Sequence, residues 1–351
     1  MVRVVEYVGA QEASFMGLNA LDYAPDNAPD NRPDLADRPY AVVLGIAQDA
    51  GYPQAGCRAT CCARAWAEPA ARRRAACLGL VDPVSGGRWL IDATPDFKVQ
   101  LRALDSTTAP RDGTRPPDLS GIALTHAHIG HYTGLLHLGR EAIGAAAVRV
   151  YAMPLMCRFL GDNAPWSQLV ADGNVELVAL EAGAEMILAR VAEDEAPHVT
   201  SKLPVRPSAD QTAPRVTLTP LLVPHRDELS ETVAYRIDGP RRSILYLPDI
   251  DGWSEWDQPL AEMIRDVDVA YLDGTFYCAD ELPGHRALDV PHPTVRSTMD
   301  LLAGESPDVR SRVRFLHLNH TNPALRPDSP EARDIAARGF SVAEEGERIR
   351  L

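Results

Sequence analysis

Three histidines, His126, His128 and His131, stand within six residues of one another. They follow an apolar run, residues 121–125, of the kind that forms a buried strand. Side chains two apart on an extended segment point the same way, so His126 and His128 face a common point, and a turn through Gly130 brings His131 to the start of a helix. Three neutral imidazoles predict a tripodal metal site that suits zinc, iron or manganese. The alternative is surface or core histidines with satisfied hydrogen bonds, which this spacing disfavours.

A second group of metal-ligand types lies earlier in the chain, where Cys57, Cys61 and Cys62 crowd together. The chain has six cysteines in 351 residues, too few for a disulfide framework. Thiolates favour a closed, tetrahedral structural zinc, which needs a fourth ligand from elsewhere in the chain. The alternative is three reduced thiols packed in a loop.

The elements that must position these groups are short apolar runs that end in turn or polar residues. They predict strands at residues 41–46, 88–92, 121–125, 148–151, 175–178, 216–223, 243–247, 269–272 and 313–316. Helices are expected between them at residues 133–142, 293–302 and 329–338. Because strands alternate with helices and hairpin-like strand pairs also occur, we expect a layered α/β sandwich rather than a strict parallel repeat.

The composition predicts a globular protein with a substantial core, since 45% of the residues are hydrophobic and 24% are charged. Pro, Asp and Asn concentrate before residue 40 and predict an N-terminal arm or loop over residues 1–39. One domain is expected over residues 40–351. The polar, Pro-rich stretch at residues 193–213 is expected to be a surface insertion.

The formal net charge of −14 argues against non-specific nucleic-acid binding, because a polyanion would be repelled. No apolar stretch approaches the length that spans a membrane, and residues 1–12 lack the pattern of a secretory signal. We therefore expect a cytoplasmic protein with a small-molecule or peptide-derived substrate and without a nucleic-acid or membrane partner. A homodimer is the alternative to a monomer.

Residues 125–131 read Thr-His-Ala-His-Ile-Gly-His and resemble the His-x-His-x-Asp-His motif of the metallo-β-lactamase superfamily, which residues 132–136 continue. Four further blocks are similar to the coenzyme PQQ synthesis protein B family, with a likeness that spans roughly residues 40–325. These blocks are residues 45–54, 91–97, 272–276 and 317–323. The resemblance implies an α/β fold, the metallo-β-lactamase αββα four-layer sandwich.

The resemblance also implies metal ligands from later strands. His225 matches the next metal histidine, Asp249 the carboxylate that often bridges two metals, and His317 the last histidine. An apolar run delivers each of them to a loop, which is where a site on such a sheet lies. The alternative for Asp249 is an ordinary aspartate in a turn at a strand end.

The chain departs from the motif at Gly130, which stands where the family has aspartate. Glycine offers no ligand atom. The first metal site is unaffected because its ligands are histidines: His126, His128 and His225. The second site keeps only His131, Asp249 and His317, which puts a two-metal mechanism in doubt.

The fourth ligand of the thiolate zinc is also implied by a resemblance. In a related cyclic phosphodiesterase group, a His-x-x-His pair resembling His317 and His320 divides between the catalytic and the structural metal. We therefore expect His320 to join Cys57, Cys61 and Cys62. Cys278 is the alternative.

Two histidines, His285 and His292, follow the block at residues 272–276, and related hydrolases use a histidine near here to protonate the leaving group. His292 is preferred because it precedes a helix whose N-terminus could receive an anion. The alternative is a loop histidine without a catalytic role. Asp273 and Asp96 are expected either to orient ligand histidines by accepting their second N–H or to have a structural role.

The function implied is hydrolysis of an ester, lactone or phosphodiester, with Asp249 and His292 as catalytic residues. One or two active-site ions, Zn²⁺, Fe²⁺ or Mn²⁺, are expected beside the structural Zn²⁺. Arg226 and Arg286 are candidates for contact with an anionic substrate. A second possibility is a mononuclear iron enzyme that activates oxygen on a peptide or amino-acid precursor, and a third is a carrier that keeps the fold without catalysis.

Overall fold

Two seven-stranded sheets form the centre of the structure, a computed structural model that describes residues 38–108, 116–188, 215–281 and 291–351. All of these residues belong to one unit, Asp34–Leu351. The insertion predicted at residues 193–213 lies outside the described residues, as do His285, Arg286 and all but the last two residues of the predicted arm. The arm and its boundary with the domain at residue 40 therefore stay predictions.

The first sheet has an antiparallel half and a parallel half. Its strand order is β14 (Arg348–Arg350), β1 (Tyr40–Gly45), β2 (Cys77–Asp82), β3 (Gly87–Ile91), β4 (Gly121–Ala123), β5 (Val148–Ala152) and β6 (Val175–Ala179). The strands from β14 to β3 pair antiparallel, and those from β3 to β6 pair parallel.

The second sheet repeats this mixed pattern. Its order is β13 (Ser341–Val342), β12 (Val313–Leu316), β11 (Val269–Asp273), β10 (Ser243–Leu247), β9 (Val233–Asp238), β8 (Val216–Leu222) and β7 (Met186–Leu188). The strands from β10 to β13 pair parallel, whereas β7, β8, β9 and β10 pair antiparallel. Strands β8, β10, β11 and β12 therefore end at the same edge of the sheet.

The sheets face each other across an apolar layer, and both are buried on their outer faces as well. Along β1, Ala41 and Val43 point into the layer between the sheets, whereas Val42 and Leu44 point to the outer face, as the two-residue period of a strand requires. Strand β10 alternates in the same way. Continuous apolar runs in the sequence thus correspond to strands covered on both sides.

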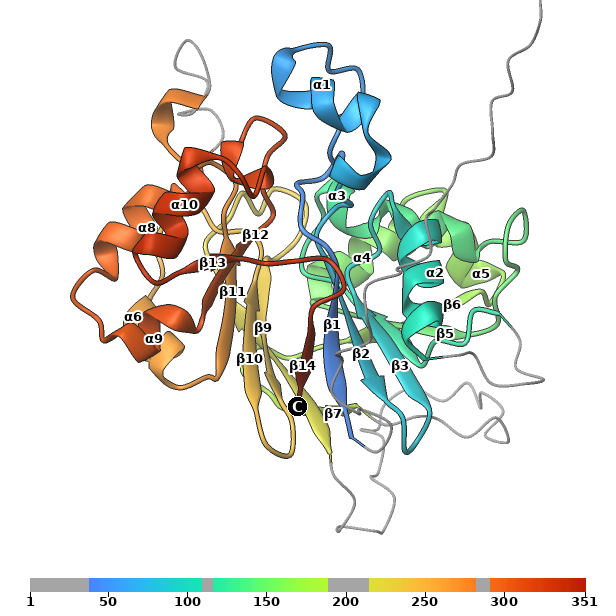
Figure 1. Cartoon of the computed structure of the whole chain (residues 1–351). Coiled ribbons are helices and arrows are strands. Elements are labelled where there is room, and N and C mark those ends of the chain that lie inside the picture. Colours follow the sequence, from blue (N-terminus) through green and yellow to red (C-terminus); the bar gives the residue numbers. More distant parts are fainter. Residues whose placement is uncertain (1–37, 109–115, 189–214, 282–290) are drawn as a thin grey trace, which may run out of the picture. The chain divides into compact units, whose positions relative to one another are not determined.

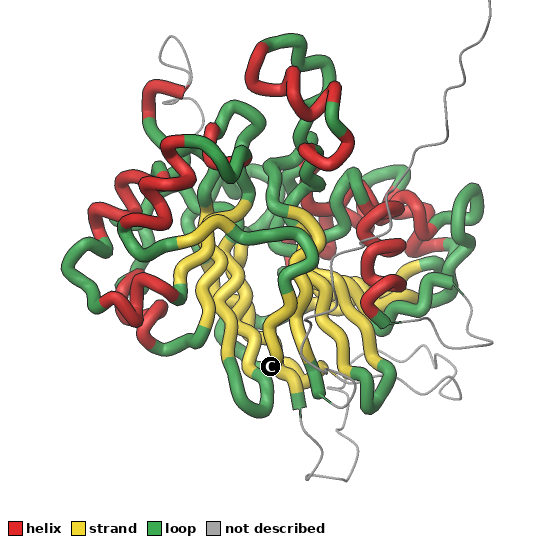
Figure 2. Tube along the Cα trace, in the orientation of Figure 1, coloured by secondary structure: helices red, strands yellow, loops and turns green. Residues whose placement is uncertain are grey.

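Helices form the two outer layers (Figure 1), and Figure 2 shows the strands lying between them. The first sheet packs against α2 (Phe97–Thr107), α4 (Pro154–Asp162) and α5 (Trp166–Ala171). The second packs against α6 (Leu260–Arg265), α8 (Val295–Leu301), α9 (Pro307–Ser311) and α10 (Pro330–Ala337). Helix α1 (Thr60–Ala67) lies at the top of the view in Figure 1, and its buried residues Cys62 and Ala65 join the same apolar cluster. The predicted αββα sandwich of four layers is confirmed.

Shorter helical segments complete the secondary structure. They are α3 (Ile129–Tyr132) and the 3₁₀ helices η1 (Pro69–Ala71), η2 (Thr133–Leu138), η3 (Ala279–Glu281) and η4 (Pro323–Leu325). The helix predicted at residues 133–142 is instead η2, because the Gly134 N–H donates to the carbonyl of Ala93 at 2.8 Å rather than to a preceding helical turn. The other two predicted helices are present as α8 and α10, and Ser329 caps α10.

Within the described part of the chain, no helix combines the length and the apolar character that crossing a membrane requires.

Candidate metal centres

The predicted site residues lie where strands end. His126 and His128 follow β4, and His131 lies on α3. From the second sheet, loops after β8, β10 and β12 carry three more residues: His225, Asp249 and His317. Because these strands end at one edge, residues up to 191 positions apart in sequence meet in one cluster.

The first ligand group consists of His126, His128 and His225. His126 Nε2 lies 2.9 Å from His128 Nδ1, and His225 Nε2 lies 3.2 Å from the same atom. The second ring nitrogens of two of these residues have partners outside the group. Thr125 Oγ1 lies 3.0 Å from His126 Nδ1, and Asp251 Oδ1 lies 2.8 Å from His225 Nδ1. These partners fix the rings with a nitrogen of each directed at a common point.

Asp249 lies between this group and the next. Its Oδ2 is 3.0 Å from His131 Nε2, 3.4 Å from His317 Nε2 and 3.7 Å from His126 Nε2. Its Oδ1 is 3.7 Å from His225 Nε2. One buried carboxylate therefore contacts histidines of both groups.

A second aspartate, Asp49, joins His131 and His317. Its Oδ1 lies 3.5 Å from His131 Nε2 and 3.4 Å from His317 Nε2, and the three residues form a ligand group of their own. Asp49 thus lies beside two of the three ligands expected for the second site. Asp49 lies inside the block at residues 45–54 that carries the family resemblance, but its type and spacing alone gave no sign that it reaches the histidines.

The arrangement fits divalent ions. His131 Nε2 and Asp249 Oδ2 are buried and have no hydrogen-bond partner, although they lie 3.0 Å apart. Buried polar atoms nearly always have a partner, and a cation between these two would be a partner for both. Imidazole with carboxylate is a donor set that suits zinc, iron and manganese.

The electrostatics keep the first group in its ligand form. Burial and the neighbouring imidazoles hold the pKa of His126 well below its usual value, and burial lowers the pKa of His128 to about 4. Burial acts the same way on His131, but the Asp92 carboxylate outweighs it and holds this pKa well above the usual value. Burial would raise the pKa of Asp249, yet His317 and His131 hold it well below. The carboxylate is therefore ionised.

Asp92, at the end of β3, holds His131 in place. Its Oδ2 lies 2.8 Å from His131 Nδ1, and its Oδ1 accepts a hydrogen bond from the backbone N–H of Thr125 at 2.8 Å. Asp92 has a φ of 69° and His317 a φ of 59°, left-handed values that few residues other than glycine adopt. Such backbone strain often accompanies functional sites. Of the two roles expected for Asp96, the structure shows the structural one, because Asp96 accepts a hydrogen bond from the backbone N–H of Ala75, and Asp92 is the carboxylate that contacts a histidine.

His292 lies beside the cluster. Its Nδ1 is 2.7 Å from Asp273 Oδ2 and 3.8 Å from Asp249 Oδ1. Burial would lower the pKa of His292, but the Asp273 carboxylate raises it to about 9. Asp273 thus orients a histidine, as expected of it, and this histidine is His292. Arg226 Nη2 lies 3.5 Å from His128 Nε2 at the exposed side of the cluster.

The cysteines form a separate centre with His320. Cys57 Sγ lies 3.7 Å from Cys61 Sγ, and His320 Nδ1 lies 3.5 Å from Cys61 Sγ and 3.4 Å from Cys62 Sγ. A tetrahedral zinc with its usual bond lengths separates two sulfurs by about 3.8 Å and sulfur from nitrogen by about 3.6 Å. The four ligand atoms therefore match a closed zinc site, and Cys278 is not among them.

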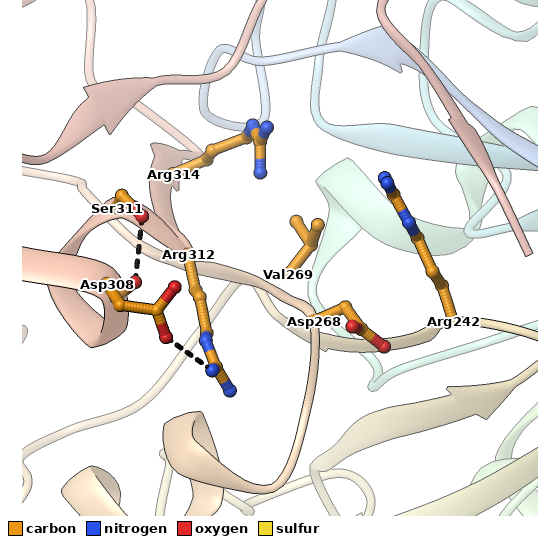
Figure 3. A pocket seen from close by; sticks show the side chains of 7 residues that line it. All are labelled: Arg242, Asp268, Val269, Asp308, Ser311, Arg312 and Arg314. Carbon is orange, nitrogen blue, oxygen red and sulfur yellow. Dashed lines mark hydrogen bonds and ion pairs between the residues drawn. The ribbon is translucent and has the colours of Figure 1, made fainter.

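A cavity of about 260 Å³ lies elsewhere, near the starts of β10, β11 and β12 (Figure 3). Three arginines and two aspartates are among its lining residues: Arg242, Arg312, Arg314, Asp268 and Asp308. These strands carry the metal-ligand types at their other ends. None of the predicted site residues lines the cavity.

The chain matches the family model described as "Beta-lactamase superfamily domain" over residues 87–317, more than half of its length. It is 27% identical over 337 residues to coenzyme PQQ synthesis protein B of Xanthomonas axonopodis pv. citri (strain 306), covering 88% of this chain and 99% of that protein.

Two solved structures share the fold. Zn²⁺-bound PqqB from Methylobacterium extorquens has a TM-score of 0.66 and 23% identity, covering 89% of this chain and 100% of that one. A diphosphatase from the PhnP family has a TM-score of 0.56 and 21% identity, covering 90% and 97%. With the family model matched across both sheets and through the histidine motif, the chain belongs to the β-lactamase superfamily.

Proposed function

We propose that the protein is a metal-dependent hydrolase that cleaves an ester, lactone or phosphodiester bond with two ions. The position of Asp249 carries this proposal, because its two oxygens face ring nitrogens of both ligand groups. A carboxylate shared between two sites keeps two ions close enough to act together on one bond.

Bound divalent ions would supply Lewis-acid activation of a water molecule and of the bond that it attacks. The chain supplies the rest. The imidazoles of His126, which is buried, and His128, which is half-buried, are neutral and need not lose a proton before they bind a metal. His292 donates its Nδ1–H to Asp273, which leaves Nε2 to protonate the departing oxygen.

The exposed edge of the cluster favours an anionic substrate. Arg226 lies next to His128 there, and a guanidinium is suited to a phosphate or carboxylate group. Among the three bond types, a phosphodiester is therefore the one we favour, in a small molecule or a peptide-derived compound. One of the fold neighbours is a diphosphatase from the PhnP family, which agrees with this choice.

Oxidation by a single iron is the other candidate, and it agrees with the likeness to proteins described as taking part in coenzyme PQQ synthesis. Gly130 by itself favours a single ion, because glycine removes one carboxylate ligand from the motif. Asp49 places a carboxylate beside His131 and His317, so the structure favours two ions over one.

The test is elemental analysis of protein purified without added metal, together with hydrolysis of bis(p-nitrophenyl) phosphate, p-nitrophenyl acetate and a simple lactone. We expect two ions per chain besides the thiolate zinc, and cleavage of the phosphodiester. One iron without hydrolysis would support the oxidative candidate, and the thiolate zinc alone would indicate a carrier. Either result overturns the proposal.

The variant His128→Ala tests the ligand assignment, with His137→Ala as its matched control. His137 stacks on Phe97 and belongs to neither ligand group. We expect the metal content and the hydrolysis to fall only in His128→Ala. An unchanged metal content in that variant would show that the imidazole is not a ligand.

A further inference from the structure

Gly130 and Asp49 occupy a single space. A Cβ atom added at Gly130 would lie 2.3 Å from Asp49 Oδ1, 2.5 Å from its Cγ and 2.6 Å from its Cα. Real Cβ atoms do not come so close to backbone or to a held carboxylate. The position that bears aspartate in the motif therefore cannot carry a side chain here, because the side chain of Asp49 already fills the volume that it would enter.

The carboxylate of Asp49 is directed at the unpartnered side of the second ligand group. Its Oδ1 lies within 3.5 Å of the Nε2 atoms of His131 and His317, and His131 Nε2 is a buried nitrogen without a hydrogen-bond partner. A carboxylate oxygen, a ligand type that suits these ions, therefore lies where an ion would need one.

The segment that carries Asp49 is fixed on both sides. The backbone of Gln48 donates to the carbonyl of Leu318 at 2.9 Å, and Leu318 follows the ligand His317 directly. On the other side, Gly51 has a φ of 71° and its N–H donates to the carbonyl of Gln48 at 2.8 Å. This tight turn holds Asp49 against His317.

We propose that Asp49 is a ligand of the second metal ion and replaces, from the loop after β1, the aspartate that the histidine motif lacks at Gly130. The second ion would then have four protein ligands: Asp49, His131, Asp249 and His317. The carboxylate comes from a distant segment of the chain instead of from the motif, and it fills the same space with the same charge. This inference rests on the metal centre of the proposed function but not on the hydrolytic reaction.

The test measures metal binding by the full chain, with Zn²⁺ as the probe, by elemental analysis and calorimetric titration. Asp49→Asn keeps the size of the side chain but removes its charge. We expect the affinity for the second active-site ion to fall at least about 100-fold, which is the upper end of the loss caused by removing a hydrogen-bond partner of a ligand. The first ion and the thiolate zinc should stay bound. The matched control is Glu228→Gln, which removes an exposed carboxylate 3.7 Å from His128 and should leave both ions bound.

A second variant makes the inference specific. Gly130→Ala adds only a Cβ, which would lie 2.3 Å from Asp49 Oδ1 and 2.6 Å from its Cα, so this variant should displace the Asp49 carboxylate and bind the second ion poorly. The retained thiolate zinc reports that each variant is folded. A second ion bound by Asp49→Asn as tightly as by the unaltered chain would overturn the inference, and so would a single active-site ion in the unaltered chain. Two ions without hydrolysis would overturn the proposed reaction alone.

Discussion

The two metal centres are built in opposite ways. The thiolate centre takes three of its four candidate ligands from one stretch of six residues, Cys57 to Cys62, and the four ligand atoms lie within 4.8 Å of one another. The imidazole and carboxylate centre takes its ligands from both sheets, and His126, His131 and His317 are each only 1% exposed. A thiolate centre would close around its ion, whereas an imidazole and carboxylate centre would leave coordination positions for water or substrate. With ions bound, the first would have a structural role and the second the catalytic role proposed above.

The largest effect should come from the residue shared by both ligand groups. Asp249→Asn keeps the size of the side chain but removes the charge between the groups, so both active-site ions should be lost while the thiolate zinc stays. Because each ion contributes several kcal/mol to transition-state stabilisation, hydrolysis should fall at least about a thousandfold. Metal content and phosphodiester cleavage are the measurements.

Its matched control is Asp268→Asn. Asp268 accepts a hydrogen bond from the backbone of Ser243 and lines the cavity of Figure 3, away from both metal centres. This variant should keep all ions. Loss of the thiolate zinc in Asp249→Asn would contradict the independence of the two centres.

Lowering the pH should weaken metal binding at the thiolate centre more than binding of the first active-site ion. Burial raises the pKa of Cys62 to about 12 and also raises that of Cys61, so zinc must displace protons from neutral thiols. Each displaced proton makes affinity fall tenfold per pH unit as pH falls. With two such thiols, affinity at the thiolate centre should drop about 100-fold from pH 7 to pH 6. The first active-site ion should lose little in this range, because its ligands His126 and His128 have lowered pKa values, whereas the second ion must displace a proton from His131, whose pKa is raised.

Cobalt(II) substitution measures the two centres in one sample, because thiolate ligands give an intense charge-transfer band that imidazole ligands lack. The charge-transfer band should disappear first on acidification. Equal losses from the thiolate centre and of the first active-site ion between pH 7 and pH 6 would show that the assigned protonation states are wrong.

The two centres also differ in how far the sequence reveals them. His126, His128 and His131, like the three cysteines, are close enough in sequence for spacing to indicate a site. His225, Asp249, His317 and His320 were expected only through resemblance to a family, and the structure brings all of them to their groups. The apolar runs predicted the strands because burial on both faces leaves a continuous pattern.

Asp49 could not be predicted from spacing. It reaches His131 and His317 only after the loop past β1 bonds to Leu318, a contact across 270 residues that no local pattern records. Asp92 was missed for a similar reason, since Asp96 lies only four residues further along and is chemically identical. Only the turn of the backbone at the end of β3 decides which of the two meets a histidine.

His292 is the proposed general acid beside the imidazole and carboxylate centre, and no residue of the thiolate centre has this role. His292→Gln keeps a side chain that can donate to Asp273 but cannot release a proton. We expect the metal content to stay the same and kcat to fall about 100-fold, the lower end of what a general acid contributes. His137→Gln is the matched control. A lost ion in His292→Gln would make His292 a ligand rather than an acid.

The smallest expected effect concerns the carboxylate behind a ligand. Asp92 accepts the Nδ1–H of His131, so Nδ1 keeps its proton and Nε2 is the nitrogen that gives up a proton to an incoming ion. In Asp92→Asn the amide can donate to Nδ1 instead, which moves the ring proton to Nε2 and blocks the ligand atom. The affinity of the second ion should fall about tenfold, within the range for such partners. The matched control is Asp96→Asn, which changes a nearby carboxylate that accepts a hydrogen bond from the Ala75 backbone instead of contacting a histidine. This variant should bind both ions normally. If the two variants bind alike in a Zn²⁺ titration, the orientation of His131 does not depend on Asp92, and the cluster is held by its ions in the same way as the thiolate centre.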